Sequence, residues 1–285
     1  MTAALRSPRV IVIGNEKGGA GKSTVALHLA TGLLHAGRRV GLIDLDLRQR
    51  SMGRFVANRR AWMAAAGVDL PMPVEGLAPG EAAGAPETAL PQFDAAFAAT
   101  LEQVDVLLID TPGGDTPLSR AAHARADLIV TPMNDSFVDF DMLGAVDPVT
   151  LDLVKPGLYA EAVWEARKRR MLADRSSLDW VVLRNRLAPA EARNRKRLDE
   201  RVAALSRRVG FRIGPGLRDR VIYRELFPFG LTIADLSAKV RPVAVSLSHV
   251  AARQELRGLM QALNLPLTAS AEPEATEELP RAAVA

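Results

Sequence analysis

Residues 10–24 read VIVIGNEKGGAGKST and leave the chain few folds to adopt. Four β-branched residues run into a glycine-rich stretch, and a helical pattern follows at once. This succession is typical of the first strand and first helix of an open α/β sheet. Glycines let the backbone N–H groups of such a loop turn toward phosphate oxygens, and the helix N-terminus adds partial positive charge. The segment therefore predicts an α/β protein built around a phosphate-binding loop.

Further apolar runs extend this prediction to a whole sheet. They occupy residues 40–43, 104–109, 128–130 and 180–183, with little alternation, as strands covered on both faces require. Between them lie helical patterns such as 22–36, which Gly37 terminates. We expect a doubly wound, mostly parallel sheet flanked by helices, of the P-loop NTPase type.

The 285 residues are consistent with one domain over 1–267. Residues 69–92 hold five prolines and three glycines, so we expect a surface excursion there with a short helical piece. Residues 268–285 are rich in Ala, Pro and Glu, which predicts a disordered acidic tail.

Each position of the loop has a predicted task. Lys22 would reach the β- and γ-phosphates, the Ser23 hydroxyl would ligate Mg²⁺, and Thr24 would contact the α-phosphate. Gly18, Gly19 and Gly21 would let the backbone wrap around the phosphates. A strict P-loop has glycine where Glu16 stands here, and a second lysine, Lys17, follows it. The alternative, a flexible glycine turn without a ligand, fits the strand–turn–helix context poorly.

Two further strand ends carry carboxylates. VGLIDLD ends in Asp44 and Asp46, and VDVLLIDTPGGD contains Asp110 followed by Gly113. Carboxylates at the carboxyl ends of parallel strands lie over the ligand crevice, where Asp110 can hold Mg²⁺ and another can position water. Gly113 would bring its N–H to the γ-phosphate. Asp44 or Asp46 taken alone could equally be a solvated carboxylate.

The loop with its early lysine resembles that of the deviant Walker A ATPases of the ParA/MinD family. The resemblance implies an ATP-dependent sandwich homodimer in which Lys17 reaches the partner's nucleotide and Gly18 lies where the subunits meet. It assigns hydrolysis to Asp46, and it assigns Asp44 and Asp110 to the magnesium side. The cofactors implied are ATP and Mg²⁺.

The family also places an asparagine on the adenine ring. In WVVLRNRL the matching residue is Asn185, whose amide can both donate to and accept from the base. A plain turn residue is the alternative for this position.

Within the family, the sequence discriminates among branches. The chain has no cysteine, whereas the iron–sulfur, nitrogenase and arsenical-pump branches need cysteines. Its acidic, proline-broken C-terminal stretch is unlike the basic membrane helix of MinD. After Asp46 the chain reads LRQR, where typical ParA proteins read PQ. The blocks that resemble the MipZ family of division-site regulators are IDLDLRQRS, TPMNDSFVDFDMLG, LRNRLAPAEARNRKRL and RVGFRIGPGLRDRVIYRELFPFGLT.

That resemblance implies a slow Mg-dependent ATPase whose dimer blocks FtsZ assembly, binds nonspecific double-stranded DNA and engages ParB. It also implies a cytoplasmic protein, nucleoid-associated and enriched toward ParB at the poles. A ParA-type segregation ATPase is the alternative with the same chemistry. A nucleic-acid-binding regulator with a degenerate nucleotide site is a third hypothesis, which the intact loop and its carboxylates disfavour.

Positive charge is concentrated in residues 181–224, where thirteen basic residues face four acidic ones. Such segregation is typical of a polyanion partner. The expected helix would present its cations on one face and an apolar stripe of Leu198, Val202 and Leu205 on another. A solvated charged helix face is the alternative. The candidate DNA contacts are Arg193, Lys196, Arg197, Arg201, Arg218 and Arg220.

Two smaller patterns complete the sequence. The four histidines have no metal-ligand spacing, so zinc is not expected. Asp135, Asp139 and Asp141 surround Phe137 and Phe140 after a predicted strand. This cluster fits either a partner or dimer surface, or a structural turn.

Overall fold

The computed structural model describes residues 8–76, 86–134, 137–147, 150, 152–185, 192–237, 240 and 247–266. The predicted tail at 268–285 lies outside these residues. The strands are β1 (Arg9–Ile13), β2 (Val40–Asp44), β3 (Val74–Glu75), β4 (Val106–Asp110), β5 (Leu128–Asn134), β6 (Gly144–Val146), β7 (Leu153–Pro156), β8 (Asp179–Asn185) and β9 (Arg212–Pro215).

The helices of the described residues include two short non-α pieces, η1 and η2. They are α1 (Lys22–His35), α2 (Ser51–Ala66), α3 (Pro86–Leu101), α4 (Pro117–Arg125), α5 (Phe137–Phe140), α6 (Leu158–Asp174), α7 (Ala192–Leu205), η1 (Ser206–Gly210), α8 (Val221–Leu226), η2 (Phe227–Phe229) and α9 (Leu247–Ala262).

A seven-stranded sheet in the order β3-β2-β4-β1-β5-β8-β9 forms the centre of the molecule. All of its strand pairs are parallel. β6 and β7 form a separate antiparallel pair. The predicted mostly parallel, doubly wound sheet is thereby confirmed.

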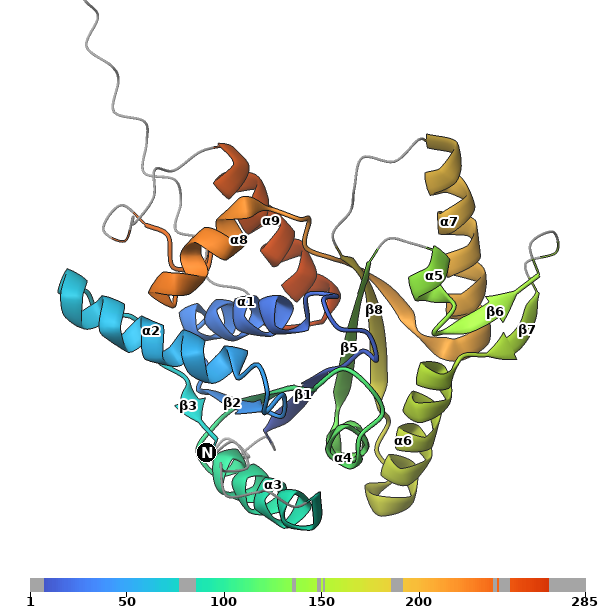
Figure 1. Cartoon of the computed structure of the whole chain (residues 1–285), viewed down its shortest axis with the longest axis horizontal. Coiled ribbons are helices and arrows are strands. Elements are labelled where there is room, and N and C mark those ends of the chain that lie inside the picture. Colours follow the sequence, from blue (N-terminus) through green and yellow to red (C-terminus); the bar gives the residue numbers. More distant parts are fainter. Residues whose placement is uncertain are drawn as a thin grey trace, which may run out of the picture.

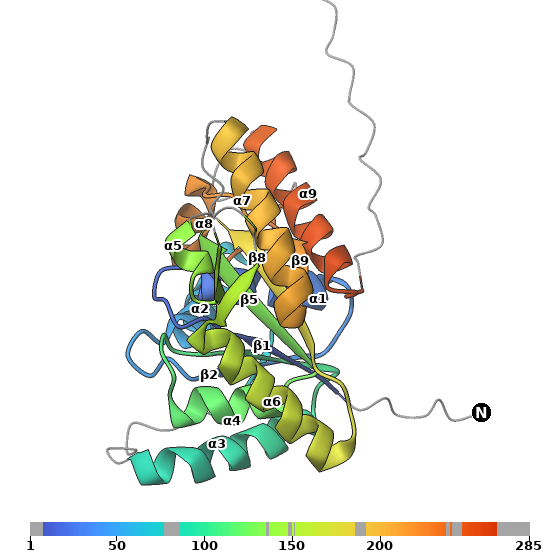
Figure 2. The same ribbon diagram turned by 90° about the vertical axis from the view of Figure 1, so that its right-hand side faces the viewer.

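The two faces of the sheet carry two separate hydrophobic cores. Ile11 and Ile13 pack on one face with α1, α2, α8 and α9, while Val10 and Val12 pack on the other with α3, α4, α6 and α7. Side chains alternate between faces along a strand, so one apolar run supplies both cores. Figure 1 shows α1, α2, α8 and α9 above the sheet and α3 and α4 below it. In Figure 2, the view turned by 90°, α6 and α7 lie on the side that faces the viewer.

The five strands and the helix expected from the apolar runs are all present. Their ends agree within about two residues, except that β5 continues four residues beyond the expected end, to Asn134. Two edge strands were not predicted. β3 has only two residues, and β9 reads RIGP, in which glycine and proline interrupt any apolar pattern. Edge strands pair on one side only, so they need less apolar sequence than central ones.

The expected surface excursion at 69–92 is partly wrong. Residues 74–75 form β3 and pair with β2 at the sheet edge, and Leu70 is buried in the core. The short helical piece expected in this range corresponds to the start of α3, a helix of 16 residues that contains Pro91. Residues 77–85 lie outside the described part of the chain.

The topology collects the functional segments at one end of the sheet. β2, β4 and β1 are neighbours and run parallel, so their carboxyl ends lie together. Asp44 and Asp110 are partners in the β2–β4 register, and Ile13 pairs with Asp110 in the β1–β4 register. The glycine-rich loop and both acidic strand ends are therefore adjacent, as the open-sheet rule predicts.

Candidate functional site

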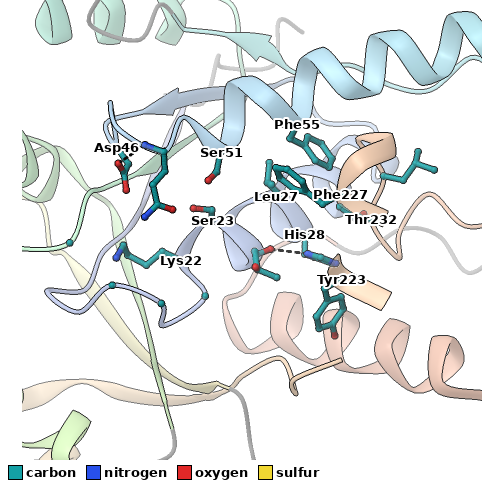
Figure 3. A pocket seen from close by; sticks show the side chains of 17 residues that line it. Lys22, Ser23, Leu27, His28, Asp46, Ser51, Phe55, Tyr223, Phe227 and Thr232 are labelled. Carbon is teal, nitrogen blue, oxygen red and sulfur yellow. Dashed lines mark hydrogen bonds between the residues drawn. The ribbon is translucent and has the colours of Figure 1, made fainter. Parts of the chain in front are cut away.

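A pocket of about 240 Å³ opens beside the start of α1. Figure 3 shows Lys22 and Ser23 at one end of it, with His28 and Tyr223 at the other. Seven of the residues expected around the phosphates line it together with Asp46, namely Gly18, Gly19, Gly21, Lys22, Ser23, Thr24 and Gly113. The fold thus brings the glycine loop, the second Asp of the DLD pair and the loop after β4 around one cavity.

Ser23 and Asp110 form the polar centre of this site. The Ser23 hydroxyl donates to Asp110 Oδ2 at 2.5 Å, while Asp110 Oδ1 is buried without a hydrogen-bond partner among the described residues. Burial is the main cause that raises the pKa of Asp110 to about 7; nearby Asp44 contributes to the rise, whereas the Ser23 hydrogen bond opposes it. A hydroxyl beside an unsatisfied carboxylate oxygen is a donor set that suits Mg²⁺.

The two lysines of the loop are both held by partners in the chain. Lys22 Nζ donates to the carbonyl of Lys17 at 3.0 Å, across the loop. Burial lowers the pKa of Lys22, and Asp110 and Asp46 oppose this by favouring its charged form. Lys17 itself forms an ion pair with Asp139 of α5.

The two carboxylates of the DLD pair have different surroundings. Asp44 is buried, and its two oxygens accept from the N–H groups of Asp46 at 3.0 Å and Met52 at 2.9 Å. Asp44 therefore fixes the turn between β2 and α2, and burial raises its pKa. Asp46 Oδ1 accepts from the N–H of Gln49 at 3.1 Å, and Asp46 lines the pocket.

Backbone geometry explains the glycines of the site. Gly19 and Gly21 have φ of 75° and 88°, a left-handed conformation that side chains rarely adopt. A Cβ on Gly113 would lie 3.1 Å from the Glu16 carbonyl and 3.4 Å from the Gly18 nitrogen. The loop after β4 thus approaches the glycine-rich loop closely enough for both to contact one phosphate chain.

Asn185 lies at the end of β8 and is buried beneath the loop. Its amide donates to the Ala20 carbonyl at 2.8 Å, and its carbonyl accepts from the Leu217 N–H at 2.8 Å. A Cβ on Gly21 would collide with this amide. Asn185 therefore braces the glycine loop against the segment after β9, and it is not among the residues that line the pocket.

Sequence reasoning did not assign the far half of the pocket. His28 lies on α1, where its Nδ1 donates to the Thr24 carbonyl at 2.8 Å, and its ring meets Tyr223 edge-on at 4.7 Å. Burial lowers the pKa of His28 to about 4. The helical position of His28, one turn after Thr24, was the available signal. Further lining residues are Leu27, Gln49, Ser51, Phe55, Phe227, Leu231 and Thr232.

The candidate DNA contacts are not equivalent. Lys196 is exposed on α7, whereas Arg201 is ion-paired with Asp141 and its side chain is only 19% exposed. Arg218 and Arg220 both pair with Glu255, with side chains 64% and 15% exposed. The side chains of Arg193 and Arg197 lie outside the described residues.

The remainder of α7 follows the predicted pattern. Leu198, Val202 and Leu205 are buried in the core, which confirms the apolar stripe. In the acidic cluster, Asp139 and Phe140 are buried. Asp135 and the Phe137 side chain lie outside the described part.

Comparison with known proteins decides the family. The family model described as ATPase MipZ matches residues 9–267. The chain belongs to the MipZ family. Among curated proteins, it is 34% identical over 166 residues to the chromosome-partitioning ATPase Soj of Thermus thermophilus, covering 53% of this chain and 64% of the relative. The match therefore spans less than two thirds of that relative.

Solved structures of ParA/MinD-type ATPases share the fold. A Cyanothece McdA variant in complex with ATP superposes with a TM-score of 0.56 at 18% identity, covering 93% of this chain and 99% of that one. The Pyrococcus horikoshii septum site-determining protein MinD with Mg-ADP gives 0.53 at 16% identity, covering 87% and 94%. At 16–18% identity these likenesses show that the chain shares the fold of those proteins.

Two features are absent from the described residues. None of the helices there is both long and apolar enough to cross a bilayer. No group of three or more His, Cys, Asp or Glu within the same residues could hold a metal ion by itself. A magnesium ion here would share its ligands between Ser23, Asp110, phosphate oxygens and water.

Proposed function

We propose that this MipZ-family chain is an ATP-driven dimerising switch that regulates where the division site forms. The observation that carries the proposal is the pocket in which the glycine loop, Asp46 and Gly113 line one cavity. The family match over 9–267 supports the interpretation of that cavity as the switch site rather than as a remnant. A degenerate site would have no need of all these groups.

The chemistry proposed is slow Mg-dependent hydrolysis of ATP. Lys22 exchanges the Lys17 carbonyl for the β- and γ-phosphates, and Thr24 receives the α-phosphate. Ser23 and Asp110 hold Mg²⁺, which neutralises phosphate charge when bound, and Asp44 supports them by fixing the turn that carries Asp46. Asp46 orients the attacking water. Asn185 contacts the adenine ring through the side-chain N–H and the oxygen lone pair that are not used by Ala20 and Leu217.

Two residues carry dimerisation in this proposal. Lys17 reaches across to the partner's nucleotide, and Gly18 lies where the subunits meet. A Cβ on Gly18 would meet no atom of the described residues within 4 Å, which leaves room there for a second copy. ATP in each subunit would then join the two loops through shared phosphate contacts.

The outputs proposed for the dimer are inhibition of FtsZ assembly and binding of nonspecific double-stranded DNA, with ParB as the polar anchor. Lys196 and Arg218 are the more exposed cations that support a DNA surface, although Arg218 also pairs with Glu255. Arg201 and Arg220 pair with carboxylates and are less exposed. The proposed location is the cytoplasm, on the nucleoid and enriched toward ParB at the poles.

A ParA-type segregation ATPase is the second candidate. The likeness to Soj, a chromosome-partitioning ATPase, favours it. It shares the nucleotide chemistry and the dimer, and differs only in output. An effect on FtsZ assembly therefore distinguishes the division-site function from the segregation function.

The decisive experiment is sedimentation of purified FtsZ polymers with this protein and ATP. We expect the polymer fraction to fall with wild type and to fall further with Asp46→Ala, which stays dimeric. The matched control is Lys17→Ala, which binds ATP but stays monomeric and should leave FtsZ polymers intact. Full sedimentation of FtsZ in the presence of an ATP-bound dimer would exclude the division-site function and leave the segregation function.

A further inference from the structure

His28 carries a buried polar atom that the phosphate contacts leave unused. The residue is 3% exposed and lines the far half of the pocket. Its Nε2 atom has no hydrogen-bond partner among the described residues, and no other side chain that lines the pocket has such an atom. Proteins rarely bury a polar atom unpaired, so this nitrogen indicates a group that binds in the pocket and completes it.

The surroundings of His28 decide which hydrogen bond its Nε2 can form. Nδ1 lies 2.8 Å from the Thr24 carbonyl, and a carbonyl only accepts, so Nδ1 carries the proton. Burial lowers the pKa of His28 to about 4, so the ring is neutral at neutral pH. In a neutral imidazole with a protonated Nδ1, Nε2 is an acceptor. A ligand that pairs with Nε2 must therefore supply an O–H or N–H group.

The ring of His28 is held in one orientation. The hydrogen bond to Thr24 fixes one edge of it, and the Tyr223 ring packs against it in a T-shaped arrangement at 4.7 Å. Tyr223 is joined to α9 in turn, because its hydroxyl donates to Glu255 at 3.4 Å. Figure 3 shows His28 and Tyr223 together, away from Lys22. Nε2 is therefore a preorganised acceptor, as a specificity contact requires.

The place of His28 along α1 selects the part of the nucleotide that it can meet. In the proposed function, Thr24 receives the α-phosphate. His28 comes one turn later, about 6 Å further along the helix. The sugar is the group that follows the α-phosphate in a nucleotide, and its 2′- and 3′-hydroxyls are donors. The base lies further from the phosphates than the sugar does.

We propose that His28 is a specificity-determining residue whose Nε2 accepts a hydrogen bond from a ribose hydroxyl of the bound adenine nucleotide. The inference rests on the proposed function, because it takes the glycine-loop half of the pocket as the phosphate site. Apolar rings of Phe55 and Phe227 line the same pocket and reduce competition from water. A nucleotide without the hydroxyl leaves Nε2 unpaired, so the site should disfavour deoxynucleotides.

The first test compares ADP with 2′-deoxy-ADP and 3′-deoxy-ADP by isothermal titration, since none of them is a substrate for hydrolysis. Wild type should bind ADP about fivefold more tightly than at least one deoxy form, which corresponds to a hydrogen bond of about 1 kcal/mol. His28→Asn keeps a donor for the Thr24 carbonyl but has no acceptor at the Nε2 position, so it should bind ADP and the deoxy forms equally. Equal affinities in wild type, or an unchanged preference in His28→Asn, would overturn the inference.

A second histidine on the same helix provides the matched control. His35 lies about two turns further along α1, pairs with Asp235 and is not among the residues that line the pocket. His35→Asn should keep the wild-type preference for ADP over the deoxy forms. Loss of this preference in both variants would assign it to α1 in general and contradict a contact with His28.

Inosine diphosphate separates the sugar from the base, because it lacks the amino group of adenine. We expect His28→Asn to leave the ratio of ADP to inosine diphosphate affinity unchanged. If this ratio falls while the preference over deoxy forms persists, Nε2 faces the base and the sugar contact is wrong. Failure of wild type to bind either ADP or pyrophosphate would be a failure of the proposed function, whereas binding without a hydroxyl preference contradicts the inference alone.

The second test observes His28 in the wild-type chain and does not depend on the stability of a variant bound to nucleotide. Nitrogen-15 NMR of labelled imidazoles reports whether Nε2 accepts a hydrogen bond. Its signal is assigned by its absence from His28→Asn or His28→Gln. ADP should shift the Nε2 signal, whereas pyrophosphate, which has no sugar, should not. Equal shifts with ADP and pyrophosphate would show that the phosphates alone act on His28 and would refute the contact.

Discussion

The Ser23 hydroxyl donates to Asp110 at 2.5 Å, which joins the first turn of α1 to the carboxyl end of β4. The other oxygen of Asp110 is buried and has no hydrogen-bond partner within the described residues. Buried carboxylate oxygens are rarely left unpaired, and such an orphan indicates an ion or water that completes the site. The first prediction follows from this pair.

Replacing Asp110 by Asn should separate magnesium binding from nucleotide binding. Asn keeps an oxygen for the Ser23 hydroxyl but loses the charge that attracts Mg²⁺. We expect ATP affinity with Mg²⁺ to fall by about tenfold or more, as loss of a charged hydrogen-bonded ligand predicts, while affinity in EDTA changes little. Isothermal titration with and without Mg²⁺ measures both. The control is Asp115→Asn, an exposed carboxylate five residues on that pairs with Arg120. An equal loss in EDTA would show that Asp110 supports the fold rather than the metal.

The switch should be locked in opposite states by two substitutions. Asp46→Ala removes the group that orients water and leaves the phosphate cradle, so ATP should bind and the dimer should persist. Lys17→Ala removes the cross-subunit cation, so the chain should bind ATP and remain monomeric. Gel filtration with ATP and phosphate release measure the two effects. Normal phosphate release from Asp46→Ala would refute its hydrolytic role.

Asn185 should matter for stability as well as for the base. Asn185→Ala leaves the Ala20 carbonyl and the Leu217 N–H buried without their partner, at a cost of about 1–3 kcal/mol for each orphaned group. Urea unfolding without nucleotide should show this loss. If Asn185 also reads adenine, the variant should lose more affinity for ATP than for tripolyphosphate, which has no base. An equal loss for both ligands would restrict Asn185 to bracing the loop.

DNA binding should depend more on the exposed cations Lys196 and Arg218 than on Arg201 and Arg220, whose side chains are less exposed. Lys196→Ala with Arg218→Ala should weaken binding to random duplexes and lower the salt slope by about one for each phosphate that is no longer neutralised. Salt titrations in the Asp46→Ala background with ATP measure this. Lys168→Ala, which removes an exposed lysine on α6, is the control and should have no effect. An unchanged slope in the double variant would make this part of the basic region a solvated surface.

His28 should make the fold sensitive to acid. Its pKa is about 4 in the folded chain against 6.5 as the ordinary value, so the unfolded chain binds the extra proton between these limits. The contribution of His28 to stability should therefore be fully present above pH 6.5 and fall toward pH 4, by up to about 1.4 kcal/mol per pH unit, whereas the raised pKa of Asp110 acts in the opposite direction. His28→Asn, which keeps a donor for the Thr24 carbonyl, should flatten this decline in thermal unfolding series. Burial also lowers the pKa of His123, which should leave a residual slope in the variant. The same decline in both proteins would assign the acid sensitivity elsewhere.

The sequence by itself determined the central strands, the first helix and the phosphate half of the pocket. These features are local, because an apolar run, a left-handed glycine and a helix start are properties of neighbouring residues. The resemblance to the ParA/MinD family pointed to two further site residues, the early lysine Lys17 and Asp46. Because the carboxyl ends of parallel strands lie over the ligand crevice, the sequence also predicted that Asp110 lies near Ser23.

Tertiary structure alone decided the partners of these residues. Packing of α8 against α1 brings Tyr223 to His28, and the return of the chain after β9 brings Leu217 to Asn185. Folding also pairs Arg201, Arg218 and Arg220 with carboxylates and leaves them exposed to different extents, which divides a basic stretch that looked uniform in sequence. Lys17 meets Asp139 only because β5 lies next to β1 in the sheet. Side-chain chemistry was evident in the sequence, but which charge neutralises which depends on distances that only the folded chain sets.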